Sequence, residues 1–212
     1  MIDIKFWFDF GVSAAGAIGG IIIGWYAIRK LVYKIKGEWC KVRQQKEMIA
    51  DRNIQEQLNE LRHDSDACRT KLFQYHNGSN FASGNSMKKM SMTHESCHPG
   101  MAPTYKGNND QVLSLFVDML ELLEKDKPIF INVNGMVDSY FKSYLQSNHI
   151  LMFSILPVKN IKGGQIGFVL CEWCGWAFID KIDEERFLEK FGATRNSIQY
   201  LLSTERMGGR NG

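Results

Sequence analysis

The stretch 154–173, "SILPVKNIKGGQIGFVLCEW", decides the fold that we expect for this chain. Two apolar runs flank Gly163 and Gly164, and glycine accepts the positive φ that a tight turn requires. The stretch therefore predicts two antiparallel strands joined as a hairpin. We expect the rest of the domain to be built around these two strands.

The segments on either side predict an α+β arrangement. Two runs with strand character flank a loop rich in Asn, Gly and Ser, which is typical of a second hairpin. Apolar residues at helical spacing predict amphipathic helices elsewhere. The predicted elements are strands at 72–76, 86–94 and 128–133 and helices at 109–125, 138–145 and 183–202. No internal repeat and no low-complexity tract interrupts them.

The first part of the chain carries a long apolar run. No charged residue occurs from Phe10 to Ile28, and about 19 residues of helix span the hydrocarbon core of a bilayer. A cleaved signal peptide and a buried core helix are the alternatives. Lys5 is the only basic residue before the run, and bulky Trp25 and Tyr26 lie at its end. A signal peptide would instead have a basic start and small residues at its cleavage site. We therefore predict a transmembrane helix, with the lipid bilayer as a partner.

Basic residues are concentrated just after this run: Arg29, Lys30, Lys34, Lys36, Lys41, Arg43 and Lys46. Lys and Arg are retained on the cytoplasmic side of a membrane. The charge asymmetry predicts a single-pass protein of the inner (cytoplasmic) membrane whose C-terminal domain faces the cytoplasm.

Gly16, Gly20 and Gly24 recur every four residues and so share one helix face. Small residues allow a second membrane helix to approach closely. The pattern predicts a homo-oligomer. The alternative is that these glycines only reflect the usual composition of membrane helices.

The segment after the run is charged and free of proline, and it predicts a helix that continues out of the membrane. Its apolar residues, Val42, Ile49, Ile54, Leu58 and Leu61, form a stripe that we interpret as too irregular for a sustained heptad. The stripe could pair in a dimer or pack on the domain that follows. The predicted organisation is an anchor at 1–36, a helical linker at 37–66, a globular domain at 67–205 and a flexible tail at 206–212.

Charge and cysteine usage exclude several functions. The net charge is +3, and the basic residues near the membrane account for the excess, which argues against nucleic acid as a partner. The five cysteines are an odd number at irregular spacings, which predicts no disulfide framework and suits a reducing compartment.

Two short cysteine motifs leave alternatives open. Cys171 and Cys174 form a CxxC at a strand end, where they could be small buried residues, half of a metal site or a redox pair. His94, Cys97 and His98 occur within "THESCHPG", which could contribute zinc ligands or be an exposed polar loop. We predict no metal and no cofactor.

Catalytic motifs are absent from the sequence, so we predict no catalytic residues and no enzymatic activity. His76 and Asn77 follow a predicted strand, where His76 could contact a ligand or close a hairpin. Ser91, Thr93 and Glu95 alternate along the next strand and should share one sheet face. If that face lines a pocket, these five residues bind a small molecule. The alternative is a solvated sheet face.

The stretch 154–173, followed by Phe178, Asp183 and a helix, resembles the C-terminal half of a GAF domain. "LFQYHNG" (72–78) and "MKKMSMTHE" (87–95) further resemble a GAF-like group from tailed-phage genomes. The resemblance covers about residues 55–205. It implies a GAF/PAS-like antiparallel sheet with flanking helices and a small ligand held between the sheet and the opposite loops.

The order of one span and one compact domain also resembles the holin of T-even bacteriophages, although that family places its domain in the periplasm. Three functions follow from these features. The first is a membrane-anchored, oligomeric and phage-encoded GAF-like binding or interaction module. The second is a holin-type lysis protein that forms membrane lesions, and the third is a small membrane-bound enzyme.

Overall fold

The computed structural model describes the backbone of residues 4–80, 86–180 and 182–207, and the side chains of 25–26, 28–78, 87–176, 179–180 and 182–203. The chain divides into two compact units, Met1–Met48 and Ile49–Gly212. Helix α1, Ile4–Asp64, contributes to both units. Most of the predicted membrane span, with Gly16, Gly20 and Gly24, falls outside the described side chains, as does the tail from residue 208. In the described part of the chain, no helix has the length and hydropathy needed to cross a membrane.

The unit Ile49–Gly212 is built on an antiparallel sheet of six strands in the order β3-β2-β1-β6-β5-β4. The strands are β1 (Arg69–Asn80), β2 (Ser86–Cys97), β3 (Gln111–Val112), β4 (Ile131–Asn132), β5 (Met152–Lys159) and β6 (Gln165–Trp173). The predicted hairpin of 154–173 is confirmed: Lys159 pairs with Gln165, and Gly163 has a φ of 80°. The predicted antiparallel sheet with flanking helices is also confirmed.

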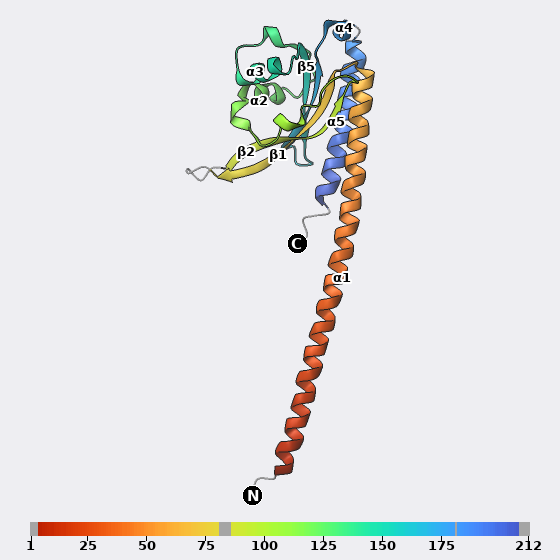
Figure 1. Ribbon diagram of the computed structural model, residues 1–212, viewed down its shortest axis with the longest axis vertical. Helices are drawn as coiled ribbons and strands as arrows, with labels where there is room; N and C mark the ends of the chain where they lie inside the picture. Colours follow the sequence, from red (N-terminus) through yellow and green to blue (C-terminus); the bar gives the residue numbers. More distant parts are fainter. Residues whose placement is uncertain (1–3, 81–85, 181, 208–212) are drawn as a thin grey trace. The chain divides into compact units, whose positions relative to one another are not determined.

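Helices cover both faces of the sheet (Figure 1). The end of α1 and α5 (Glu184–Met207) pack on one face, whereas α2 (Val117–Glu124) and α3 (Tyr140–Ser147) pack on the other. The short helix α4 (Trp176–Ile179) follows β6. We name the two buried layers the α1/α5 core and the α2/α3 core.

The α1/α5 core includes Ile54, Leu58, Leu61, Leu72, Val169, Trp173, Phe187, Phe191, Ile198 and Leu202. The α2/α3 core includes Phe73, Met90, Met92, Phe116, Met119, Leu123, Phe141, Leu145, Phe153 and Phe168. Alternation along the strands separates the two sets, because successive side chains point to opposite faces. Leu72 and Phe73 on β1 illustrate this alternation.

The last part of α1 belongs to the globular unit. Ile54, Leu58 and Leu61 are fully buried in the α1/α5 core, and Thr70 Oγ1 donates a hydrogen bond to the Leu58 carbonyl at 2.8 Å. Lys190 of α5 lies 3.2 Å from Asp64 of α1. The stripe predicted on this helix therefore packs on the domain over 54–61, one of the two roles considered for it.

The structure corrects several predicted elements. The predicted helix 109–125 is shorter, because Gln111 and Val112 pair with Met90 and Lys89 at the sheet edge and α2 begins only at Val117. The first hairpin is longer than predicted, since β1 continues through residues 76–80. A strand of only two residues, such as β3, is too short to show the alternation of apolar and polar residues by which strands are predicted.

Gly167 marks a point where β1 and β6 approach closely. A Cβ atom at this position would overlap the carbonyl oxygen of Phe73 and lie 3.1 Å from Cα of Gln74. Backbone atoms of a paired strand cannot move aside without disturbing the ladder. Glycine is therefore required here for steric reasons.

We predict that Gly167→Ala lowers the free energy of unfolding by about 2 kcal/mol or more, because it creates overlap inside the sheet. Gly192→Ala is the matched control, since a Cβ at Gly192 of α5 meets no atom within 4 Å. The control should gain roughly 0.5–1 kcal/mol from helix propensity. Urea unfolding of both variants tests this, and equal stability of the two would contradict the close approach.

Candidate functional site

A buried ion pair lies at the centre of the sheet, on the face of the α2/α3 core. Lys71 Nζ of β1 is 2.7 Å from Glu172 Oε1 of β6, and both side chains are fully buried. Arg69 Nη1 lies 3.8 Å from Glu172 Oε2. Strand register explains this proximity, because Arg69 pairs with Glu172 and Lys71 with Leu170, the next residue of β6 on the same face.

Burial of these charges costs free energy, which their ionic and hydrogen-bond partners must offset. A charge removed from water must regain its lost solvation from opposite charges and hydrogen bonds. Arg69 also donates from Nε to the Ala102 carbonyl at 3.2 Å. Among the described residues, Glu172 Oε2 has no hydrogen-bond partner. The cluster of Arg69, Lys71 and Glu172 thus leaves one carboxylate oxygen able to accept a further hydrogen bond.

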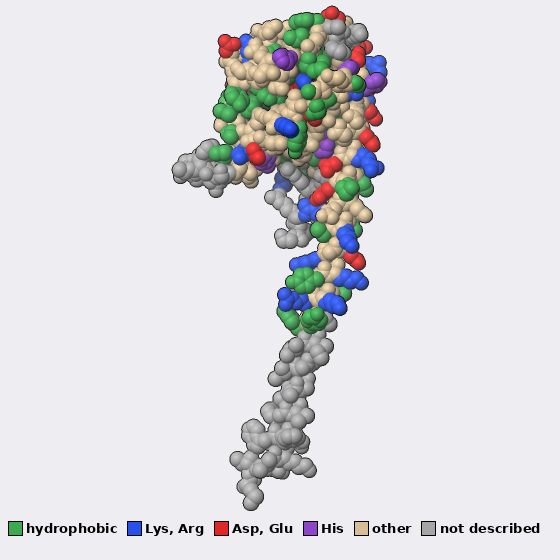
Figure 2. All heavy atoms as spheres, viewed as in Figure 1, with side chains coloured by type: hydrophobic (Ala, Val, Ile, Leu, Met, Phe, Trp, Pro, Cys, Tyr) green, Lys and Arg blue, Asp and Glu red, His purple; other side chains and the backbone are tan. Residues whose placement is uncertain are grey.

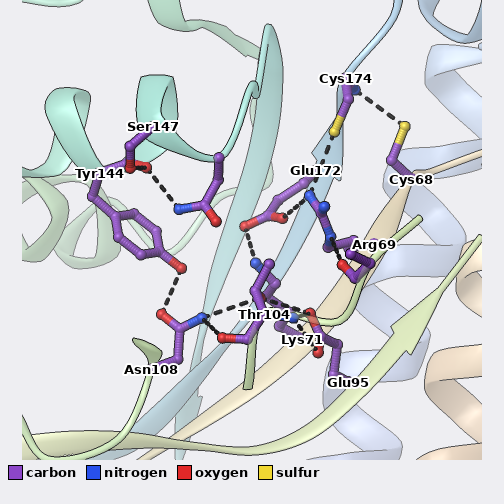
Figure 3. A network of polar contacts seen from close by, with 12 residues as sticks. Cys68, Arg69, Lys71, Glu95, Thr104, Asn108, Tyr144, Ser147, Glu172 and Cys174 are labelled. Atoms are coloured by element: carbon purple, nitrogen blue, oxygen red, sulfur yellow. Dashed lines mark hydrogen bonds and ion pairs between the residues drawn. The ribbon is translucent and has the colours of Figure 1, made fainter. Parts of the chain in front are cut away.

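A chain of hydrogen bonds lies beside this cluster (Figure 3). Glu95 of β2 accepts from the backbone N–H of Thr104 at 3.0 Å and from its hydroxyl at 2.7 Å. Asn108 donates to the Thr104 carbonyl at 2.8 Å, and Tyr144 of α3 donates to Asn108 Oδ1 at 2.7 Å. This chain fixes the loop 103–108 between the sheet and α3.

An open cleft with a volume of about 880 Å³ separates the loop 103–108 from α3. We call it the α3 cleft. Its wall carries aromatic rings and amide groups from Tyr105, Asn108, Gln111, Tyr140, Tyr144 and Asn148. Burial and the nearby Glu172 carboxylate raise the pKa of Tyr144 well above its usual value, so its hydroxyl stays a donor.

Gln111 lines the α3 cleft and carries a buried acceptor that is unpaired within the described part of the chain. Its Nε2 donates to the Gly107 carbonyl, whereas its Oε1 is buried and has no hydrogen-bond partner among the described residues. A buried polar atom without a partner is costly.

The five predicted site residues do not share one surface. A bulge between Leu72 and Phe73 makes Thr93 an extra residue in β2, because Leu72 pairs with His94 and Phe73 with Met92. A bulge shifts the alternation by one residue. Glu95 consequently pairs with Lys71 and reaches the loop 103–108, whereas Ser91 pairs with Gln74. The predicted common face of Ser91, Thr93 and Glu95 is wrong.

Ser91 and Thr93 line a different cleft, together with Asp51, Arg52 and His94. His76 Nε2 lies 2.9 Å from Ser91 Oγ, and Ser91 Oγ accepts from the Asp110 backbone N–H at 2.9 Å. His76 pairs with Lys89 inside the strand and closes no turn. Asn77 is exposed and pairs with Lys88. Ligand binding by these residues stays a prediction.

The contact of His76 with Ser91 is not a catalytic triad. Asp110 Oδ1 lies 3.8 Å from the same nitrogen, His76 Nε2, that contacts Ser91. In a triad the carboxylate accepts from the other ring nitrogen and so orients the base. Ser91 here is held as an acceptor by a backbone N–H. The arrangement therefore favours a structural hydrogen bond over nucleophile activation.

The cysteine and histidine motifs do not converge on a metal. Cys171 is buried in the α1/α5 core, whereas Cys174 packs against the α2/α3 core, so the CxxC pair is split between the two faces. His94 contacts Asp51 of α1 at 3.4 Å. Over the described ranges, no group of three or more His, Cys, Asp or Glu residues is arranged to hold a metal ion.

The sequence analysis identified Glu95 but missed most of the other residues of the site. Glu172 occurs within the apolar run "FVLCEW", where a charge is unusual in a buried strand, whereas Lys71 follows the polar residues of "RTKLF". That interruption was the available signal for the ion pair. Thr104, Asn108 and Tyr144 occur in ordinary polar or amphipathic segments, so no sequence pattern marks them.

Comparison with known proteins shows the fold. The sequence matches no protein-family model and no curated protein sequence. The photoproduct state of GAF3 from Slr1393 of Synechocystis sp. PCC6803 is 14% identical, with 76% of this chain and 98% of that chain covered and a TM-score of 0.57. The phycocyanobilin-bound GAF domain from a cyanobacterial phytochrome is 15% identical, with 82% and 98% covered and a TM-score of 0.56. The globular unit therefore has the GAF fold.

Proposed function

We propose that this chain is a membrane-anchored, oligomeric GAF-like module, encoded by a phage and without catalytic activity, whose α3 cleft binds a small planar molecule. The observation that carries the proposal is the α3 cleft, whose wall is fixed by the hydrogen bonds from Glu95 to Tyr144. The solved GAF domains bound to phycocyanobilin and phycoerythrobilin support a small-molecule role for this fold.

The chemistry of the α3 cleft favours a nucleoside-sized heterocycle. Tyr105 and Tyr140 line it with rings that are 55% and 53% exposed, and exposed aromatic rings stack on flat ligands. The amides of Asn108, Gln111 and Asn148 supply both donors and acceptors along the wall. The resemblance implies a ligand between the sheet and the opposite loops, and the loop 103–108 is one wall of the α3 cleft. The space between the sheet and helices α2 and α3 is filled by the packed side chains of the α2/α3 core.

We expect adenosine or guanosine to bind the full-length protein, as measured by equilibrium dialysis, with biliverdin as the bilin comparison. Tyr140→Ala should weaken nucleoside binding about tenfold through lost stacking. Tyr200→Ala is the control, since it removes a tyrosine of similar exposure from α5, away from the cleft. The proposal fails if neither nucleoside binds or if Tyr140→Ala binds as tightly as the native protein. Binding of biliverdin alone would also overturn the nucleoside assignment.

Membrane anchoring rests on the uncharged run from Phe10 to Ile28 and on the residues that follow it. In the unit Met1–Met48, Trp25 and Tyr26 are 68% and 70% exposed, as suits rings placed at a membrane interface. Basic side chains gather on the visible face of α1 just beyond the grey atoms (Figure 2). The basic residues of this part of the helix include Arg29, Lys30, Lys34, Lys36, Lys41, Arg43 and Lys46.

Oligomerisation rests on the glycine face and on a second, longer stripe. Exposed apolar side chains recur on α1 at alternating spacings of four and three residues: Ile28, Val32, Ile35, Trp39 and Val42, followed by Ile49 one heptad later. A repeat of this period forms the seam of a left-handed coiled coil. Lys46 interrupts it once. We call the set from Ile28 to Ile49 the seam. Its spacing is more regular than that of the stripe from Val42 to Leu61 described from the sequence.

Two cysteine variants in a Cys40→Ser background test anchoring, topology and pairing together. We expect Val42→Cys to form a disulfide-linked dimer in oxidised membranes, because residue 42 lies on the seam. Arg43→Cys, one residue away, should cross-link much less and should resist a membrane-impermeant maleimide in intact cells. Recovery of the protein in the soluble fraction would contradict membrane anchoring. Equal cross-linking of Val42→Cys and Arg43→Cys would contradict pairing along the seam. Labelling in intact cells contradicts the cytoplasmic assignment and favours the holin alternative.

A further inference from the structure

Cys68 and Cys174 form a thiol pair that the sequence does not reveal. Cys68 directly precedes β1 and Cys174 directly follows β6, so the antiparallel pairing of these strands brings the two residues together. Cys174 donates its backbone N–H to Cys68 Sγ at 3.2 Å. Figure 3 shows both sulfur atoms at the edge of the buried charged cluster.

Charges near the pair activate one of its thiols. Arg69 Nη1 donates to Cys174 Sγ at 3.6 Å. Hydrogen bonding by Cys174, together with the nearby Arg69 and His98, lowers the pKa of Cys68 to about 6 despite burial. A thiolate is the reactive form of cysteine. The pair therefore joins a thiol of lowered pKa, Cys68, to a second thiol, Cys174, whose pKa is raised by its hydrogen bond to Cys68 and by burial.

The other cysteines of the globular unit lack this environment. Cys171 is fully buried on the opposite face of the sheet, and burial raises the pKa of its thiol. Cys97 is half-buried, and desolvation and Glu95 raise its pKa. These two residues are inert by comparison, so the reactivity is specific to one pair.

We propose that Cys68 and Cys174 form a redox site in which hydrogen peroxide converts the two thiols into a disulfide. The Cys68 thiolate attacks one peroxide oxygen, the O–O bond breaks, and the departing hydroxide takes a proton from solvent to become water. Cys174 sulfur then attacks the resulting sulfenic acid. An S–S bond forms, the S–O bond breaks, and the oxygen leaves as water with the Cys174 proton. The two thiols lose two electrons, and one peroxide is reduced to two waters.

Burial explains the choice of oxidant. Cys68 is only 1% exposed, so a small peroxide suits the site better than a bulky disulfide. Cys174 is half-buried and borders Arg69. The disulfide would join the start of β1, four residues after the end of α1, to the segment between β6 and α4.

Mass spectrometry of the full-length Cys40→Ser protein tests the proposal, because Cys40 is exposed and could otherwise link two chains. The protein is treated with hydrogen peroxide, blocked with N-ethylmaleimide and digested with trypsin. We expect a cross-link between peptides 63–69 and 163–181, with fragmentation placing it at Cys174, and its loss on reduction with dithiothreitol.

Three variants make the test specific. Cys68→Ser and Cys174→Ser should each abolish the linked peptide, whereas Cys97→Ser should leave its yield unchanged. Thermal unfolding of each variant before oxidation confirms that the fold persists. A link between Cys171 and Cys174, a link to Cys97, or free thiols at Cys68 and Cys174 after treatment would each overturn the proposal.

Discussion

The ion pair between Lys71 and Glu172 is the interaction on which the rest of the domain depends. It joins β1 to β6 at the centre of the sheet with both side chains fully buried. Removing one partner would leave an uncompensated charge in the interior, which typically costs 3–5 kcal/mol. The pair also lies beside the hydrogen bonds from Glu95 to Tyr144 that shape the α3 cleft. One charge pair thus connects the packing of the sheet to the geometry of the candidate site.

The same region places two distinct chemistries next to each other. Arg69 contacts Glu172 on one side and Cys174 on the other, so the buried carboxylate and the proposed redox pair share one guanidinium. The fold requires this arrangement because β1 and β6 are central neighbours whose ends lie together. Binding in the α3 cleft and oxidation of the thiols would therefore act on adjacent parts of a single network.

Much of the fold could be predicted from the sequence because its signals are local. The Gly163 turn, the apolar runs beside it and the helical period of α5 are all contained within short windows. The extent of β1 and β2 could not be predicted, because polar residues such as His76 and Asn77 continue the strand through backbone pairing alone. The short strand β3 depends on an edge that another segment supplies, so tertiary context decides it.

The candidate site was less predictable, for two physical reasons. Strict alternation assigned Ser91, Thr93 and Glu95 to one face, and a single bulged residue separated Glu95 from Ser91. The reactive partner of Cys174 is Cys68, 106 residues away in sequence, whereas the CxxC spacing pointed to Cys171. The spacing of residues in the sequence predicts which side chains are neighbours only within one helix or strand. Both wrong expectations concern contacts between different strands.

A double-mutant cycle on Lys71 and Glu172 tests the central claim most directly. The free energy of unfolding would be measured by urea denaturation of the full-length chain for Lys71→Met, Glu172→Leu and the double variant. We predict that each single variant loses about 3–5 kcal/mol, and that the double variant loses less than the sum of the two, because it removes the buried charges of Lys71 and Glu172 together. Arg69 loses its carboxylate in both variants that lack Glu172. Additive losses in the double variant would show that the two side chains act independently and would contradict the account.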